Sequence, residues 1–304
     1  MIDKNNDIIG EITKLKKQRN AIILAHNYQR PEVQDIADFV GDSLELSQKA
    51  AKTNANVLVL CGVNFMAETA YIVNPKKVVL LPDMDSGCPM ADMVTVEALI
   101  AKKKELPGVT VVCYVNSTAA IKAESDICCT SANAVKVVQS LGDKEILFIP
   151  DKYLGQWVAE KTGHKMHLWP GFCPTHVRIS AGDILERKKG FPNAVTLVHP
   201  ECLPEAKAVA DEVLSTGGMI RYARESNVKE MIIGTETGII YRLQKENPGK
   251  TFIPVTVKAV CPNMKRITLE KVLWSLQKME NRIVVPEDIR VRALSSVERM
   301  LAIV

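Results

Sequence analysis

The stretch Pro82-Asp-Met-Asp-Ser-Gly-Cys-Pro-Met90 follows a predicted strand at residues 77–81 and places a cysteine directly before a proline. Two later stretches repeat this order of apolar run, cysteine and proline. The cysteines of the three stretches are Cys88, Cys173 and Cys261. They are separated by 85 residues (88 to 173) and by 88 residues (173 to 261). This nearly equal spacing predicts three copies of one unit, each with a cysteine at the end of a buried strand that points at a shared centre.

Each third of the chain alternates short apolar runs with helical stretches. Strands are predicted at 21–25, 57–62 and 78–81, then at 110–115, 126–129, 145–149 and 166–169, and finally at 194–198, 213–214, 231–233 and 251–260. Helices are predicted at 8–19, 31–39, 44–53, 65–73 and 154–161, before residue 243, at 267–279 and from 286 onward. Such alternation is typical of right-handed β-α-β units with parallel sheets that are covered on both faces. The sequence therefore predicts an α/β fold of three similar α-β-α sandwich units.

Polar residues follow the predicted strands, where parallel sheets bind ligands. The first strand of each unit is followed by His26, Asn116 and His199, in that order. The turns before the next helices carry Ser43, Ser131 and Thr216. These hydroxyls are plain helix caps, part of anion sites at helix N-termini, or both. The histidines are either structural or able to bind a carboxylate and transfer protons, and Glu201, two residues after His199, is a candidate base.

The three periodic cysteines have two interpretations. Buried apolar cysteines are common in protein cores, and we assign the other five to the core: Cys61, Cys113, Cys128, Cys129 and Cys202. Three thiolates that meet with a fourth position open instead fit a cubane iron–sulfur cluster with one iron free to act as a Lewis acid. A closed structural zinc site has four protein ligands and leaves no such position. His176, three residues after Cys173, is a candidate supporting residue for this site.

Composition and motifs narrow the function classes. The 304-residue chain has a net charge of +4, and only 5% of its residues are aromatic. Neither value indicates that it binds nucleic acid. Neither a dinucleotide fingerprint nor a phosphate loop is present. The start has no secretory signal and no apolar run reaches bilayer length, so we expect a cytoplasmic protein without membrane contact. Eight cysteines in a reducing compartment point to metal or redox chemistry rather than disulfides.

The order of these motifs resembles the quinolinate synthase (quinolinate synthetase A) family along nearly the whole chain. The matching segments are Leu24-Ala-His-Asn-Tyr-Gln29, Asp35-Ile-Ala-Asp-Phe-Val-Gly-Asp-Ser43, Phe65-Met-Ala-Glu68, Cys88-Pro-Met-Ala91, Tyr114-Val-Asn-Ser-Thr118, Thr130-Ser-Ala-Asn-Ala134, Cys173-Pro-Thr-His176, His199-Pro-Glu-Cys202, Ser215-Thr-Gly-Gly218, Gly234-Thr-Glu236 and Cys261-Pro-Asn-Met264. The resemblance implies a pseudo-threefold arrangement of the units around a central cavity. We expect domains at 1–92, 93–176 and 177–264, with a helical segment at 265–304 packing on them.

The resemblance also implies a reaction and a set of site residues. The family condenses iminosuccinate (2-iminoaspartate) with dihydroxyacetone phosphate and releases phosphate and two waters to give quinolinate for NAD biosynthesis. A 4Fe–4S cluster would be held by Cys88, Cys173 and Cys261 with its fourth iron open. Iminosuccinate contacts would fall on His26, Ser43, Tyr114, Asn116, Ser131, His199, Glu201 and Thr216. Tyr28 would lie on the mobile closing face of the first unit and, with Glu201, His26 and His199, form the catalytic group.

Other functions stay open at the level of the sequence. A regulatory iron–sulfur or zinc protein would need a recognition helix or a basic face, and an electron carrier would need a second redox group; neither is evident. A third alternative keeps the cluster and dehydrates a different hydroxy acid. The enzyme that supplies iminosuccinate, an aspartate oxidase or an aspartate dehydrogenase, is the one candidate protein partner. The cysteine cluster that some members carry around the last ligand is reduced here to Cys261, so no thiol switch is expected there.

Overall fold

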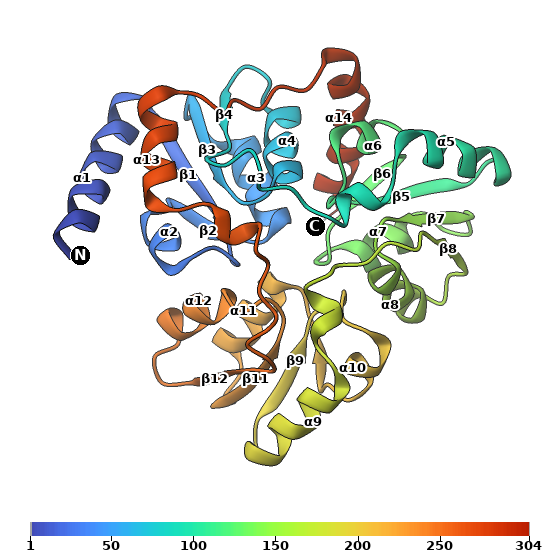
Figure 1. Cartoon of the computed structure of the whole chain (residues 1–304). Helices are drawn as coiled ribbons and strands as arrows, with labels where there is room; N and C mark the ends of the chain where they lie inside the picture. Colours follow the sequence, from blue (N-terminus) through green and yellow to red (C-terminus); the bar gives the residue numbers. More distant parts are fainter. Residues whose placement is uncertain (1, 304) are drawn as a thin grey trace.

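The structure, a computed structural model, describes residues 2–303 and contains three four-stranded sheets. All their strand pairs are parallel. The strand orders are β2-β1-β3-β4, β6-β5-β7-β8 and β10-β9-β11-β12, which is one order repeated three times. Figure 1 shows the sheets, each flanked by helices, as three units around a common centre. The predicted α/β class with three similar units is confirmed.

The first unit holds one helix before each strand. Its strands are β1 (Ala21–His26), β2 (Phe39–Gly41), β3 (Val57–Cys61) and β4 (Val78–Leu80), and its helices are α1 (Ile2–Gln18), α2 (Pro31–Ile36), α3 (Ser43–Lys52) and α4 (Asn64–Val73). The helix predicted over 31–39 is shorter in the structure, and strand β2 was not predicted. The helix ends early because Ala37 already has an extended backbone, and a strand of three residues is too short to show a period of two.

The second and third units repeat this order. The second contains α5 (Val96–Glu105), β5 (Thr110–Tyr114), α6 (Ala119–Ala123), β6 (Ile127–Cys129), α7 (Ala134–Ser140), β7 (Ile146–Ile149), α8 (Lys152–Thr162) and β8 (Met166–Leu168). The third contains α9 (Ala181–Gly190), β9 (Val195–Val198), α10 (Pro204–Ala208), β10 (Glu212–Val213), α11 (Thr216–Glu225), β11 (Glu230–Gly234), α12 (Ile239–Glu246) and β12 (Thr251–Pro254). The central strands β3 and β7 are buried along their whole length, as expected for sheets covered on both faces.

Strand register gives the equivalence between the units. In each unit the first two strands begin to pair at one residue pair. These residue pairs are Leu24 with Phe39, Val112 with Ile127 and Leu197 with Glu212. Each pair spans 15 residues, so Leu24, Val112 and Leu197 are equivalent positions. Two residues further on, the chain carries His26, Tyr114 and His199. The prediction that Asn116 matches the two histidines is therefore wrong, because β5 runs on to Tyr114 and Asn116 is instead equivalent to Tyr28 and Glu201.

An aspartate for which no role was predicted recurs in all three units. The carboxylate Oδ2 of each accepts a hydrogen bond from a backbone amide of the first strand, over 2.7 to 2.8 Å. The backbone amide of the same aspartate in turn donates to the carbonyl of that first-strand residue, over 2.9 to 3.1 Å. The pairs are Asp38 with Ile23, Asp126 with Val111 and Asp211 with Thr196. The spacing of these aspartates, 88 and 85 residues, was visible in the sequence, but an exposed acidic residue carries no pattern by itself.

The three periodic cysteines lie in loops and not at the strand ends themselves. Strands β4, β8 and β12 stop at Leu80, Leu168 and Pro254. Proline cannot donate to a strand ladder, which is consistent with the early end of β12 and its position at the sheet edge. Each cysteine is then followed, three residues later, by a one-turn 3-10 helix. These helices are η1 (Ala91–Met93), η2 (His176–Arg178) and η3 (Met264–Arg266).

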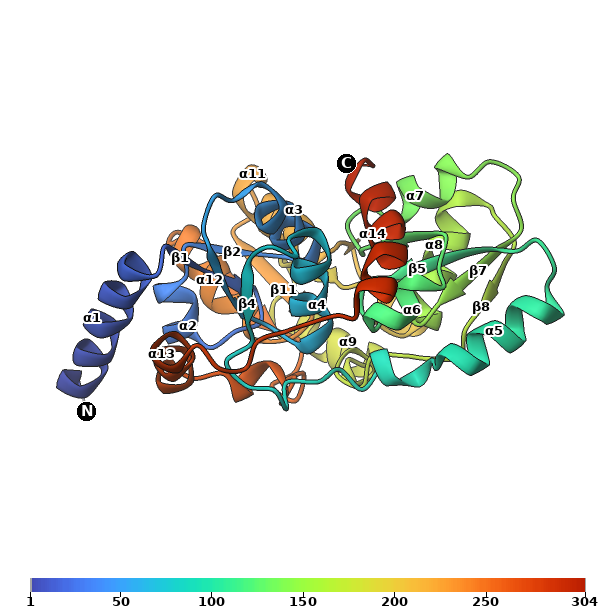
Figure 2. The same ribbon diagram turned by 90° about the horizontal axis from the view of Figure 1, so that it is seen from above.

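The C-terminal segment forms two helices that lie against elements of the first and second units. Helix α13 (Leu269–Lys278) lies against α1 and β3, and α14 (Glu287–Leu301) lies against α6, β6 and α4. The view from above in Figure 2 places α14 between the first and second units. Among the helices in residues 2–303, none combines the length and the hydropathy that a membrane span requires.

Candidate active site

One cavity of about 310 Å³ is lined by residues from all three units. Every residue predicted for the site borders it: Cys88, Cys173 and Cys261, with His26, Tyr28, Ser43, Tyr114, Asn116, Ser131, His199, Glu201 and Thr216. They gather there because the carboxyl ends of the parallel strands in each unit open toward this cavity. Residues from all three thirds of the chain therefore border one pocket.

None of the three predicted hydroxyl residues is a helix cap, because the cap residue of α7 is Asn133 and not Ser131. The cap of α3 is Asp42, whose carboxylate accepts from the amides of Leu44 and Glu45, and the cap of α11 is Ser215. Ser43 and Thr216 are the first residues of these helices instead. Because their neighbours satisfy the free amides, both hydroxyls are left to line the cavity.

Glu201 is a buried carboxylate held by two donors from other segments. The Tyr114 hydroxyl donates to its Oε1 over 2.5 Å, and Nδ1 of His176 lies 2.9 Å from its Oε2. Burial by itself would raise the pKa of Glu201, but the neighbouring imidazoles and these hydrogen bonds lower it below the usual value. The pKa of Tyr114 is raised by burial and by the Glu201 charge, so the phenol keeps its proton. Glu201 is therefore an ionised hydrogen-bond acceptor at neutral pH.

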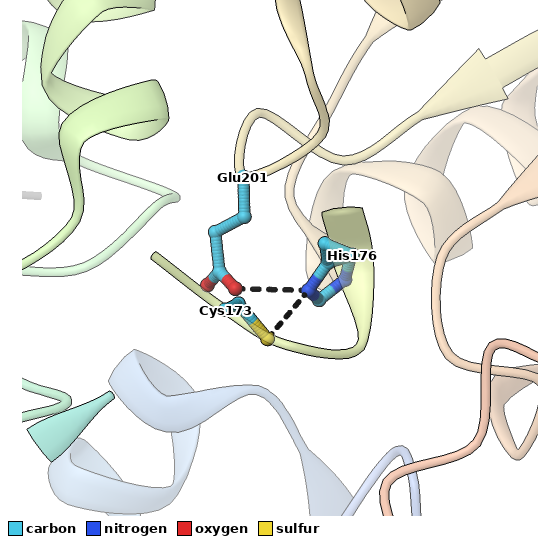
Figure 3. A group of neighbouring side chains, drawn as sticks. All are labelled: Cys173, His176 and Glu201. Carbon is cyan, nitrogen blue, oxygen red and sulfur yellow. Dashed lines mark hydrogen bonds and ion pairs between the residues drawn. The ribbon is translucent and has the colours of Figure 1, made fainter. Parts of the chain in front are cut away.

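His176 connects Glu201, a cysteine and the first unit. Its Nδ1 also lies 3.2 Å from Sγ of Cys173, and Figure 3 shows the three side chains pointing toward one another. On the other side of the ring, Nε2 lies 2.8 Å from Oγ1 of Thr235, which lies 2.5 Å from the Tyr28 hydroxyl. Thr235 is not among the predicted site residues, although it directly follows the end of β11. The result is a continuous hydrogen-bonded chain from Tyr28 to Glu201.

The two equivalent histidines, His26 and His199, are neutral. Burial is the main cause that lowers the pKa of each to about 3, with the positive charge of Lys265 adding to it for His26. In both rings Nδ1 accepts the backbone amide two residues later, from Tyr28 over 3.2 Å and from Glu201 over 3.3 Å. The proton of each neutral ring must then be on Nε2. Both histidines are thus hydrogen-bond donors at Nε2, and that of His199 lies 3.2 Å from Oγ of Ser131.

The three lining cysteines share one local geometry. The backbone amides two and three residues after each cysteine face its sulfur and favour the thiolate, although burial dominates and raises the pKa of each thiol, for Cys88 to about 12. The amides belong to Met90 and Ala91, to Thr175 and His176, and to Asn263 and Met264. Buried thiols with amides directed at them become thiolates once a cation neutralises them. The other five cysteines are buried in the core, as predicted.

Comparison with known proteins identifies the family. Residues 10–302 match the family described as "Quinolinate synthetase A protein". The chain belongs to the quinolinate synthase family. It is 60% identical over 297 residues to the quinolinate synthase of Dehalococcoides mccartyi strain CBDB1, covering 98% of each chain. It is 57% identical over 293 residues to that of Geobacter metallireducens, covering 96% of each. It is 55% identical over 303 residues to that of Desulforudis audaxviator, covering 99% of this chain and 100% of the relative. The chain is thus a quinolinate synthase, an enzyme of NAD biosynthesis.

Proposed function

We propose that this quinolinate synthase condenses iminosuccinate with dihydroxyacetone phosphate and releases quinolinate, phosphate and two waters. The observation that carries the proposal is the shared cavity, in which thiols from three units lie with neutral histidines, hydroxyls and the ionised Glu201. Atoms balance in this reaction: one new C–C bond and one new C–N bond form, and the carbonyl and hydroxyl oxygens leave as water.

We propose that Cys88, Cys173 and Cys261 hold a 4Fe–4S cluster. The cysteine-only donor set and the amides directed at each sulfur fit such a group. Among the described residues, the only three candidate ligands with donor atoms within 4.8 Å of one another are Cys173, His176 and Glu201. At least one pair of the three sulfurs is therefore more than 4.8 Å apart, wider than around one zinc ion, where bonds of about 2.3 Å hold sulfurs roughly 3.8 Å apart. When bound, a cluster with an iron free of cysteine supplies a Lewis acid that binds oxygen groups and favours loss of water.

The chain's own donors suit a substrate with two carboxylates. Nε2–H groups of His26 and His199 and the hydroxyls of Ser43 and Thr216 come from the first and third units, and Tyr114, Asn116 and Ser131 add polar groups from the second. Hydrogen bonds to a charged acceptor are the stronger kind, so this set, together with the Arg178 side chain that also lines the cavity, suits a dianion. Iminosuccinate is such a dianion.

Glu201 and Tyr28 are the proposed proton-transfer residues. Removal of a proton from the carbon next to the imine of iminosuccinate is required before the new C–C bond forms. The ionised Glu201 is the available acceptor, and His176 and Thr235 connect it to the Tyr28 hydroxyl. Burial and the Glu201 charge raise the pKa of Tyr28, so this phenol keeps a proton that it can donate to a departing hydroxyl.

The test is an anaerobic assay of quinolinate from the two substrates. The purified enzyme should be brown, contain iron and sulfide, and form quinolinate that chromatography detects. Cys173→Ala should lose both the colour and the product, whereas Cys129→Ala, which changes a buried core cysteine, should keep both. Full iron content and activity in Cys173→Ala would refute the cluster assignment. Dehydration of another hydroxy acid by the wild-type enzyme, without any quinolinate, would refute the reaction.

We also infer how the chain is divided and where it works. The repeat of four strands and a 3-10 helix supports domain limits at 1–92, 93–176 and 177–264, with 265–304 as the packing segment. Eight free cysteines fit a reducing, cytoplasmic compartment. Transient contact with the enzyme that supplies iminosuccinate remains the one protein partner that we propose.

A further inference from the structure

A second hydrogen-bonded chain leads into the cavity from the outside of the third unit. Arg242 of α12 donates from Nη1 to Oδ1 of Asn27 over 2.7 Å, and Nδ2 of Asn27 donates to Oγ1 of Thr216 over 3.2 Å. Arg242 also donates to the Val40 carbonyl over 2.8 Å and pairs with Glu246 over 2.6 Å. Asn27 is fully buried, and Thr216 is 3% exposed. This series of hydrogen bonds therefore links the first unit to the third immediately beside the site.

The direction of this chain follows from the chemistry of its members. A guanidinium has no acceptor, so the Asn27 atom that faces Arg242 must be the amide oxygen. The amide nitrogen then faces Thr216 and can only donate to it. The Asn27 backbone is also held, because its amide donates to the Gly41 carbonyl over 3.1 Å. The orientation of the Asn27 amide is thus determined from both ends.

The hydrogen of the Thr216 hydroxyl is not used in the contact with Asn27. A hydroxyl whose oxygen accepts from Asn27 keeps its own hydrogen for another acceptor. Thr216 is the first residue of α11, so the carbonyl four residues earlier does not belong to this helix and is not a helical acceptor for the hydroxyl. The side chain borders the cavity. The free hydrogen is therefore available to an acceptor in the cavity.

We propose that Asn27 and Arg242 are positioning residues that orient the Thr216 hydroxyl as a donor to a substrate carboxylate. This inference rests on the proposed function, because it takes the carboxylate to be one of iminosuccinate. Preorientation matters because a hydroxyl that points its hydrogen elsewhere offers the carboxylate only lone pairs and repels it. Neither residue touches the substrate, so both act through Thr216.

The isosteric change Asn27→Asp tests the orientation. An aspartate keeps the contact with Arg242 but presents only acceptor atoms to Thr216, so the hydroxyl hydrogen turns toward residue 27. We expect the KM for iminosuccinate in the loaded enzyme to rise about tenfold or more, as for loss of a hydrogen bond to a charged group, while kcat stays within about twofold. Calorimetry with succinate as a stable dicarboxylate should show a matching loss of affinity.

The variant Thr216→Val separates orientation from the added negative charge. In this background the hydroxyl is absent, so Asn27→Asp should have no further effect on KM. An effect of equal size in both backgrounds would mean that charge alone acts, and would overturn the inference. A KM of Asn27→Asp equal to that of the wild type would also overturn the inference. Tyr241→Phe, which removes a hydrogen bond to Asp35 between the same two units, should leave KM unchanged and controls for unit packing. Absence of quinolinate from the wild-type enzyme would instead count against the proposed function.

Discussion

The Tyr114 hydroxyl of the second unit donates to the Glu201 carboxylate of the third over 2.5 Å. The two residues are equivalent to positions in the other units that carry different chemistry, namely histidine for Tyr114 and tyrosine or asparagine for Glu201. The threefold repeat therefore supplies the scaffold, and its broken symmetry gives the Glu201 carboxylate a tyrosine donor beside its His176 contact.

Loss of that partner should lower turnover. Tyr114→Phe removes the donor and leaves the buried Glu201 carboxylate with one hydrogen bond fewer. A charged hydrogen bond contributes about 1.5–3 kcal/mol, so we expect kcat/KM to fall by roughly 10- to 100-fold. Anaerobic steady-state kinetics with matched iron content would measure this. Unchanged kinetics would mean that the contact does not act in the reaction.

The repeated aspartates should stabilise the sheets. Asp211→Ala leaves the Thr196 amide without its acceptor, and we expect the free energy of unfolding to fall by about 1–3 kcal/mol. Lys188→Ala removes only the exposed ion pair with Asp211, so it should cost at most about 1 kcal/mol. Urea denaturation of both variants separates the two contributions. Equal losses would show that the ion pair, and not the backbone hydrogen bond, matters.

The effect of Asp211 should depend on pH. Burial opposes ionisation, but the Thr196 amide and then Lys188 lower the pKa of Asp211 below its usual value. A lowered pKa means that the stabilisation is complete above the unfolded pKa of about 3.9 and is lost as the pH falls through the lower folded value. The difference in unfolding free energy between the wild type and Asp211→Ala should therefore be constant from pH 5 to 7 and become smaller in more acidic buffer. A difference in unfolding free energy that grows as the pH falls would contradict this prediction.

The contact between the first and third units should be sensitive to one methyl group. A Cβ at Gly217 would lie 2.5 Å from Oδ2 of Asp42, whose other oxygen is held by the amides at the start of α3. We expect Gly217→Ala to cost about 1–3 kcal/mol of unfolding free energy. Gly182 occupies the same position in α9, where the nearest atom would be 3.6 Å away. Gly182→Ala should therefore be nearly neutral, and a similar loss in both variants would point to the backbone instead.

The last helix should contribute to stability without taking part in chemistry. Met300 of α14 is fully buried, and Met300→Ala should cost about 2–5 kcal/mol. Val291 on the same helix is 52% exposed, so Val291→Ala should stay within about 0.5 kcal/mol. Both variants should keep the wild-type KM for iminosuccinate at a temperature where they are folded. A changed KM in Met300→Ala would mean that α14 reaches the site.

The sequence by itself determined the threefold period, the α/β class, the three lining cysteines and the loops that form the site. These features are local: an apolar run followed by polar residues defines a strand exit wherever it occurs, and parallel sheets open their ligand sites at those exits. Only the tertiary structure decided that Tyr114, and not Asn116, matches the histidines, because this depends on strand register. It also decided that His176 joins Cys173 to Glu201 and that Arg242 reaches Asn27, 215 residues away. Contacts between units depend on side-chain direction across an interface, and no spacing along the chain encodes that direction.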